Sequence, residues 1–356
     1  MSDTRDEEDQ ARGAMNPATP ATAWLEEFVP RRFLSGGHMQ TIAGNFLPRP
    51  SNLPSSESLY VEVDAATASK VLCHCHWQPA EVRSQRLTVV LVHGLEGSSD
   101  SQYVIGNADR AWAAGCNVVR MNMRNCGGTD HLSPTLYHSG LSGDVGAVVD
   151  RVVTEHALSA VALIGYSMGG NLVLKLAGEC GISIPQLKAV VGVSPAMDLA
   201  ASAAALHYPR NRVYEWRFLL RLMKRFRLKA KLFPDIFSPM RLTGIRSLWD
   251  FDDRITAYYS DFDGAEDYYY RASSTRVAHG IAVPTLVLHS LDDPFIRMLP
   301  ETRAILQANG NVTLVETEHG GHCAFLAPAG DYDGYWAEKT LLGFLMDTCE
   351  FESKDL

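Results

Sequence analysis

Residues 162–170 read Ala-Leu-Ile-Gly-Tyr-Ser-Met-Gly-Gly, and this stretch decides the fold. Residues 165–169 form the pattern G-x-S-x-G, with Ser167 at the centre. The apolar run before it, residues 160–164, is typical of a buried strand, and residues 171–178 are typical of a helix. This context predicts a nucleophile elbow, with the serine at the apex of a sharp turn, rather than an ordinary turn with a surface serine. Such a turn requires glycine at positions 165 and 169, because a Cβ at either position would collide with neighbouring segments.

Length and charge narrow the function classes. With 356 residues, the chain can form one large α/β domain with an insertion, or two domains. A net charge of -9 argues against nucleic acid as a partner, because phosphate binding needs clustered Lys and Arg. The acidic start lacks the apolar region of a secretory signal, and no apolar run approaches the ~18 residues that span a bilayer. The seven cysteines, an odd number, are expected to be reduced thiols in a cytoplasmic protein.

The run Cys73-His74-Cys75-His76 has residue types that bind metals. On a strand, however, alternate residues point to opposite faces, so the two cysteines share one face and the two histidines the other. A second cluster that would complete a tetrahedral site is missing from the sequence. We therefore expect no metal site.

Strand and helix patterns predict an α/β fold with a mostly parallel central sheet flanked by helices. Residues 1–23 are polar and predicted to be a disordered tail, and residues 24–350 are predicted to form a single domain. The early strands have no helices between them, whereas the later ones alternate with helices, so an antiparallel start should lead into a parallel sheet. The expected strands are residues 59–63, 71–77, 87–92, 118–123, 160–164, 189–193, 285–289 and 312–315, and the expected helices include 105–114, 141–154 and 171–179.

The alternation stops between about residues 196 and 280. This segment is rich in aromatic and charged residues and contains no clear strand. Because it lies between two core strands, we expect a mainly helical cap inserted into the domain.

A serine nucleophile needs a base and an acid that orients the base, and in this fold class they follow the serine in the order acid, then histidine. The strand at residues 285–289 is followed by Ser-Leu-Asp-Asp-Pro. Asp293, beside Pro294, is the predicted acid, with Asp292 as the alternative.

The predicted base follows the last strand, in Glu318-His319-Gly320-Gly321-His322. We expect the two glycines to permit a tight approach to the serine loop, which favours His322 over His319. His138 precedes the elbow, so it has the wrong chain order for a base and is expected either in an ordinary loop or lining the pocket.

An acyl-transfer site also needs hydrogen-bond donors for the developing oxyanion. We expect one to be the backbone N–H of Met168, at the start of the helix after the elbow. The other is expected from the loop His93-Gly94-Leu95-Glu96-Gly97, where the N–H of Leu95 is the candidate.

Several further segments resemble the YheT-like branch of the α/β-hydrolase superfamily. Residues 36–42 (GGHMQTI) are similar to the segment before the first strand in that branch, and residues 93–97 resemble its oxyanion loop. Residues 122–128 (NMRNCGG) resemble its Asn-x-Arg-Gly-Cys-Ser-Gly loop, with Asn125 where glycine is usual. Asn tolerates a left-handed backbone better than most residues, so we expect the turn to be kept. Further matches lie at residues 137–140, 251–257 and 267–269, and the resemblance runs from about residue 30 to 345.

The resemblance implies a serine hydrolase of the α/β-hydrolase fold that acts on carboxylic esters, with short- or medium-chain acyl esters or acylglycerols as substrates and no cofactor or metal. An acyltransferase, in which an alcohol replaces water, would use the same residues. The third hypothesis is a binding protein without catalytic activity, and it is disfavoured because candidates for all three triad positions are present.

Residues 215–233 form a strongly basic segment in an acidic chain. Its apolar residues recur at helical spacing, which predicts a cap helix whose apolar stripe packs on the core. The alternative is a peripheral contact with anionic membranes, as basic amphipathic helices make. The predicted stripe contains Trp216, Leu219, Leu220, Met223 and Phe226.

Overall fold

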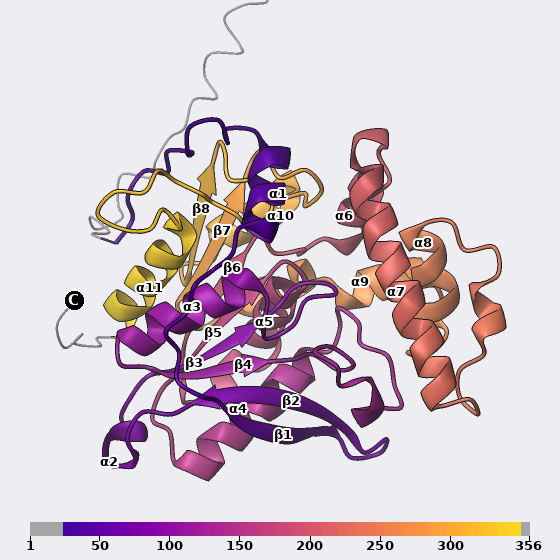
Figure 1. The fold of residues 1–356 in the computed structure, drawn as a ribbon, viewed down its shortest axis with the longest axis horizontal. Helices are drawn as coiled ribbons and strands as arrows, with labels where there is room; N and C mark the ends of the chain where they lie inside the picture. Colours follow the sequence, from indigo (N-terminus) through magenta and orange to yellow (C-terminus); the bar gives the residue numbers. More distant parts are fainter. Residues whose placement is uncertain (1–23, 350–356) are drawn as a thin grey trace, which may run out of the picture.

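The computed structural model describes residues 24–349, so the predicted tail at residues 1–23 lies outside the described residues. All eight predicted strands are present and form one sheet in the order β1-β2-β4-β3-β5-β6-β7-β8 (Figure 1). Strand β2 pairs antiparallel with both β1 and β4, and all other pairs are parallel. The predicted antiparallel start is therefore confirmed. The strands are β1 (Glu57–Asp64), β2 (Ser69–His76), β3 (Thr88–Val92), β4 (Asn117–Met121), β5 (Val161–Tyr166), β6 (Leu187–Val193), β7 (Thr285–Ser290) and β8 (Val312–Thr317).

Helices cover both faces of the sheet and give two separate apolar cores. On one face, α3 (Gln102–Ala113) and α11 (Trp336–Thr348) pack on residues such as Val89 and Leu91 of β3. On the other face, α4 (Ser142–His156) and α5 (Met168–Cys180) pack on the alternate residues, Val90 and Val92. All five residues of β3 are buried, as expected for a parallel strand between two helical layers. The shorter helices α2 (Ala80–Arg83) and α10 (Pro300–Ala308), and α1 (Gly37–Phe46) before the first strand, complete the core domain.

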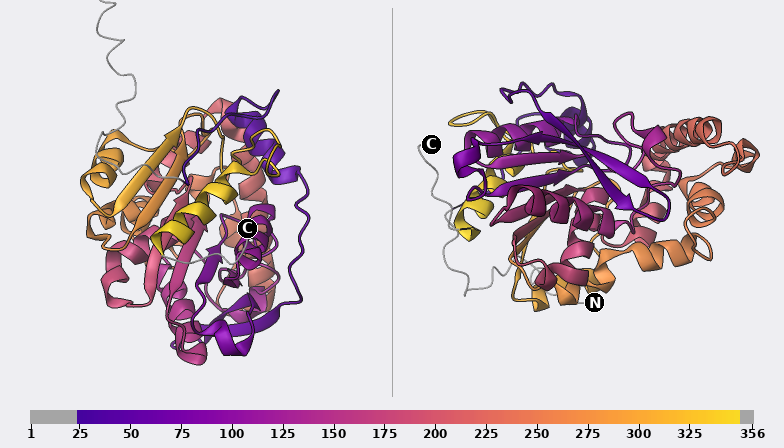
Figure 2. Two further views of the ribbon diagram at one scale, coloured as in Figure 1. Left: turned by 90° about the vertical axis from the view of Figure 1, so that its left-hand side faces the viewer. Right: turned by 90° about the horizontal axis from the view of Figure 1, so that it is seen from below.

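The stretch between β6 and β7 forms the cap and contains no strand in this described part of the chain. Its helices lie together at the side of the molecule where the carboxyl ends of β3 and β5 point (Figure 1). Viewed from below, the cap projects beyond one end of the sheet (Figure 2). The elements are α6 (Leu199–Leu206), α7 (Arg212–Leu232), α8 (Leu248–Phe251), a π-helical turn (Asp252–Ala257) and α9 (Ala265–Ala272).

Helix α7 packs with a different face from the predicted one. Leu219 and Phe226 are buried as expected, but Trp216 is 64% exposed and Leu220 is 44% exposed. The buried face is centred on Leu222 and Phe226 instead. The prediction of a single stripe from Trp216 to Phe226 is therefore wrong, because polar anchors on the same helix set its rotation.

Lys229 is one of these anchors. Its ammonium group is fully buried and donates to Asn125 Oδ1 at 2.9 Å, to the carbonyl of Asp130 at 3.0 Å and to the carbonyl of Ser133. Burial, aided by the charge of Arg225 and opposed by that of Asp130, lowers the pKa of Lys229 to about 8. Asn125 has a φ of 64°, so the turn is kept where the resemblance placed a glycine, and its side chain binds the cap.

No helix among residues 24–349 has the length and apolar character required to cross a membrane.

Replacing Lys229 by methionine should loosen the cap. The substitution keeps the length of the side chain but leaves Asn125 Oδ1 and two carbonyl oxygens without their donor. Since each buried unsatisfied polar group costs about 1–3 kcal/mol, we expect Lys229→Met to reduce the free energy of unfolding by about 2–4 kcal/mol. Urea denaturation of the wild type and the variant measures this change in the free energy of unfolding. Lys231→Met, on the exposed side of the same helix, is the control and should change stability by less than about 0.5 kcal/mol. Equal midpoints for the two variants would contradict the anchoring role.

Candidate active site

Ser167 lies at a strained turn between β5 and α5. Its φ and ψ are 55° and -116°, a combination rarely adopted by residues with a side chain, and its N–H donates to the carbonyl of Val193 at 2.9 Å. A Cβ on Gly165 would collide with the carbonyl of Gly169. A Cβ on Gly169 would collide with the carbonyl oxygens at the end of β3. The predicted steric reason for both glycines is confirmed.

Asp293 and not Asp292 contacts His322. The carboxylate of Asp293 is fully buried, and its Oδ1 accepts from the N–H groups of Phe295 and Ile296 at 3.0 and 2.9 Å. Its Oδ2 accepts from Nδ1 of His322 at 2.8 Å. Burial alone would raise the pKa of Asp293, but the charge of His322 and this hydrogen bond outweigh burial and hold it below its ordinary value.

Asp292 has a different set of partners. It accepts from the N–H of Gly321 at 2.8 Å and from Ser290 Oγ at 3.0 Å. Nδ1 of His319 lies 3.4 Å away, and the ring of His319 is 42% exposed. Asp292 therefore shapes the loop that carries His322 and does not touch the His322 ring.

His322, the predicted base, and Ser167 line the same cleft. The ring of His322 is 12% exposed. Burial by itself lowers the pKa of His322, but the neighbouring Cys323 and Asp293 outweigh burial and raise it above the ordinary value. Among residues 24–349, no hydrogen bond joins Ser167 to His322, and Nε2 lies 3.6 Å from Sγ of Cys323. Catalytic hydrogen bonds are often long before substrate binds.

Helix α1 holds the loop that carries His322. Thr41 Oγ1 accepts from the N–H of His322 at 2.8 Å. The amide of Gln40 accepts from the N–H of Leu326 at 2.8 Å and donates to its carbonyl at 3.0 Å. A Cβ on Gly321, whose φ is 59°, would collide with α1. The glycines were predicted to permit a tight approach to the serine loop. That reason is wrong for Gly321, because the close neighbour is α1.

The loop after β3, which carries Leu95, lies against Ser167. An added Cβ on Gly94 would be 3.1 Å from Cβ of Ser167, so the loop after β3 approaches the serine closely. His93 holds that loop through Nδ1–H, which donates to the carbonyl of Gly94 at 2.8 Å, while Nε2 accepts from the N–H of Met123 at 3.1 Å. Burial lowers the pKa of His93 to about 4, so the ring is neutral at pH 7.

The N–H groups of Leu95 and Met168 have no hydrogen-bond acceptor within residues 24–349. Both residues line the cavity beside Ser167. Two unpaired backbone donors near a nucleophile are what an oxyanion hole requires.

The sequence did not predict a polar network that joins this loop to the cap. Glu96 Oε1 accepts from the hydroxyl of Tyr137 at 2.6 Å and from Nε of Arg225 at 2.8 Å. Arg225 also donates to Asp130 at 3.1 Å. The sequence shows only an acid in the loop after β3 and one arginine among several basic residues of α7, and this pattern does not distinguish a buried ion pair from charges on the surface.

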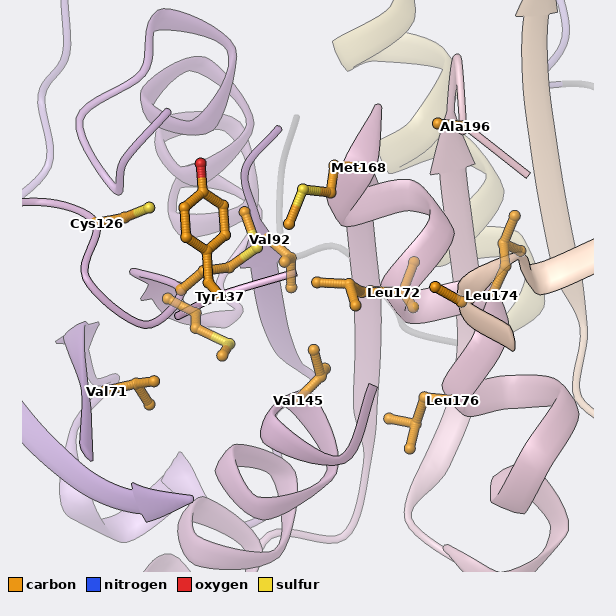
Figure 3. Close-up of a cluster of buried hydrophobic side chains, with 14 of the residues drawn as sticks. Val71, Val92, Cys126, Tyr137, Val145, Met168, Leu172, Leu174, Leu176 and Ala196 are labelled. Carbon is orange, nitrogen blue, oxygen red and sulfur yellow. The ribbon is translucent and has the colours of Figure 1, made fainter. Parts of the chain in front are cut away.

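An apolar cavity of about 110 Å³ extends from Ser167 into the cap. Figure 3 shows Tyr137, Met168 and Ala196, three residues that line it, within the adjoining core. Two titratable groups, the half-buried His138 and the buried Asp252, also line the cavity. Burial, with the charges of two arginines, lowers the pKa of His138 to about 3. Burial raises the pKa of Asp252 to about 6, although it accepts hydrogen bonds from Thr256 and Tyr269 at 2.8 and 2.9 Å.

Comparisons with known proteins agree with this fold. The family model described as the alpha/beta hydrolase fold matches residues 88–328. The Escherichia coli (strain K12) protein named "Putative esterase YheT" is 31% identical over 92% of this chain and 95% of its own length. Phospholipase ABHD3 of Bos taurus is 28% identical over 72% of this chain and 61% of its own.

A solved structure shows the same fold. An esterase of Pyrococcus furiosus, Pf2001, aligns with 85% of this chain and 97% of its own at a TM-score of 0.53, with 16% identity. Since the family model spans most of the sheet and the bacterial relative matches almost end to end, the chain belongs to the YheT-like branch of the α/β-hydrolase family.

Proposed function

We propose that the protein is a serine hydrolase that cleaves carboxylic esters through an acyl-enzyme. The observation that carries this proposal is the hydrogen bond from His322 to the buried Asp293, because the ring of His322 lines the same cleft as the serine on the strained elbow. The similarity to relatives named as a putative esterase and a phospholipase supports it.

In the acylation step, Oγ of Ser167 attacks the ester carbonyl while Nε2 of His322 accepts the hydroxyl proton. Asp293 keeps the proton on Nδ1 and stabilises the imidazolium that forms. This step requires the Ser167 hydroxyl to face Nε2 in place of the thiol of Cys323.

The N–H groups of Leu95 and Met168 would stabilise the oxyanion, and His322 would then protonate the departing alcohol. Water repeats the sequence on the acyl-enzyme and releases the acid. None of these steps needs a cofactor or a metal.

The acyl chain would occupy the apolar cavity beside Ser167. A cavity of about 150 Å³ holds one benzene molecule, so 110 Å³ fits a short chain more readily than a long one. This favours short- or medium-chain acyl esters or acylglycerols.

An acyltransferase would use the same residues, with an alcohol in place of water in the second step. Product analysis in the presence of added glycerol separates the two activities. A binding protein without catalysis is disfavoured, because the buried pair of Asp293 and His322 is intact.

The first test is covalent labelling of the purified protein with a fluorophosphonate probe. We expect labelling of the wild type and at least a 1,000-fold loss of p-nitrophenyl butyrate hydrolysis in Ser167→Ala, since the nucleophile is removed. Mass spectrometry of the labelled peptide distinguishes Ser167 from Cys323. A folded wild type that is not labelled, or an adduct on Cys323, would overturn the proposal.

The acid can be tested with a pair of neighbouring variants. Asp293→Asn should lower kcat by about 10⁴-fold, as the equivalent change does in serine proteases. Asp292→Asn should lower kcat by less than about tenfold, because Asp292 does not contact the His322 ring. His322 acts as a base only when neutral, so its raised pKa should place the acidic limb of kcat/KM above pH 6.5. Removing the Asp293 charge lowers that pKa and should move the limb to lower pH. A larger loss in Asp292→Asn would reassign the acid.

Substitutions on α6 can test whether the acyl chain occupies the apolar cavity. Ala203 is half-buried and lines the cavity, while Ala204, next to it, is exposed. We expect Ala203→Phe to fill the cavity and lower kcat/KM for p-nitrophenyl octanoate at least tenfold relative to the acetate, because mismatches of a few methylenes cost about 1–3 kcal/mol each. Ala204→Phe should keep the wild-type ratio. The same ratio in both variants would place the acyl chain elsewhere.

A further inference from the structure

A second, much wider cleft opens beside the apolar cavity and also contains Ser167 and His322. We call it the vestibule. It measures about 1,000 Å³ and lies between the loop after β3, helix α1 and helix α7. Because the apolar cavity can take the acyl chain, the vestibule is the space left for the alcohol part of an ester.

The vestibule is positively charged, although the chain as a whole carries a net charge of -9. Three carboxylates line it, and each is engaged by an arginine: Asp100 pairs with Arg120 outside the cleft, and Glu96 and Asp130 share Arg225, which leaves one net negative charge at that cluster. Five further cations line it, and no carboxylate among residues 24–349 lies within ion-pair distance of them. These five are Arg217, Arg221, Lys224, Arg227 and Lys231.

The uncompensated charge is close to the reacting atoms. Arg221 donates to the carbonyl of Glu96 at 3.3 Å, one residue after the predicted oxyanion donor Leu95. Burial, with the charge of Arg221, lowers the pKa of Arg217, as expected for two cations that face each other without a counter-charge. The guanidinium of Arg217 lies 5.4 Å from the ring centroid of Phe46 on α1, so it sits against the opposite wall of the cleft.

We infer that the vestibule binds an anionic, phosphate-bearing alcohol group of the ester substrate. This inference rests on the proposed ester hydrolysis and specifies its substrate class. A cleft lined by charges of one sign concentrates ligands of the opposite sign and raises association rates by about 10- to 1,000-fold at low salt. Guanidinium groups also match the geometry of phosphate oxygens. The acyl chain would then enter the apolar cavity while the phosphate faces α7.

The test compares two water-soluble esters with the same acyl group, 1-butyryl-glycerol and 1-butyryl-glycerol 3-phosphate. We expect the wild type to have a kcat/KM at least tenfold higher for the phosphate ester in about 20 mM salt. This preference should fall severalfold at about 500 mM salt, where the charges are screened within about 4 Å.

The double variant Arg221→Gln and Lys224→Gln should reduce the ratio of the two kcat/KM values about tenfold. Lys70→Gln combined with Lys188→Gln removes the same charge from exposed positions outside the vestibule and should keep the ratio. Equal kcat/KM for the two esters at low salt, or the same ratio in both double variants, would overturn the inference.

Two further results distinguish failure of this inference from failure of the proposed ester hydrolysis. Hydrolysis of butyryl-glycerol that depends on Ser167, with no preference for phosphate, would refute this inference and leave ester hydrolysis standing. Cleavage of neither ester, together with no labelling of Ser167, would refute both.

A vesicle experiment distinguishes a soluble phosphate group from a membrane surface. Co-sedimentation is measured with phosphatidylcholine vesicles, with and without about 20% phosphatidylglycerol. Binding to the anionic vesicles without any preference for the soluble phosphate ester would show that α7 contacts membranes and would overturn the inference. Preference in solution supports it whether or not vesicles bind.

Discussion

The turn at Ser167 can form only where three chain segments meet almost in contact. Gly169 lies against the carboxyl end of β3, and Gly165 lies against the first turn of α5. This approach forces Ser167 into its strained conformation and leaves the N–H of Met168 unpaired at the helix start. The other parts of the site have to be positioned around this fixed point by their own contacts.

Those contacts come from segments that are distant in the sequence. Asp293 is fixed by two backbone N–H groups after β7, and His322 is held by Asp293 on one side and by Thr41 of α1 on the other. The loop after β3 is fixed by a neutral, buried His93. Each of these groups is already hydrogen-bonded before substrate arrives, so little reorganisation would be needed when charge develops on the oxyanion.

The cap is joined to the core by cations as well as by its apolar face. Arg225 binds Glu96, and Lys229 binds Asn125 and two backbone carbonyls. Both cations are on the inner side of α7, while the remaining basic residues of the helix face the vestibule or solvent. The same helix therefore holds the cap in place and gives the cleft beside Ser167 its charge.

The sequence by itself determined the eight strands, the change from antiparallel to parallel pairing, and the elbow. Buried parallel strands are recognisable as continuous apolar runs, and the sharp turn requires glycines two residues before and two residues after the serine. It also brought the choice of residues down to Asp293 or Asp292 and His322 or His319. The sequence favoured Asp293 and His322, but the candidates for each role lie within three residues of each other and have the same chain-order evidence, so both alternatives stayed open. Only the tertiary structure, which turns one carboxylate toward the ring and its neighbour away, separated them geometrically.

The face of α7 was likewise decided by the tertiary structure. Periodicity placed Trp216 and Leu220 in the apolar stripe, but the hydrogen-bond acceptors for Lys229 lie on the loop of Asn125 to Ser133. The rotation of a helix with several apolar residues around its circumference is set by such fixed polar partners, and these are brought together only when the chain has folded.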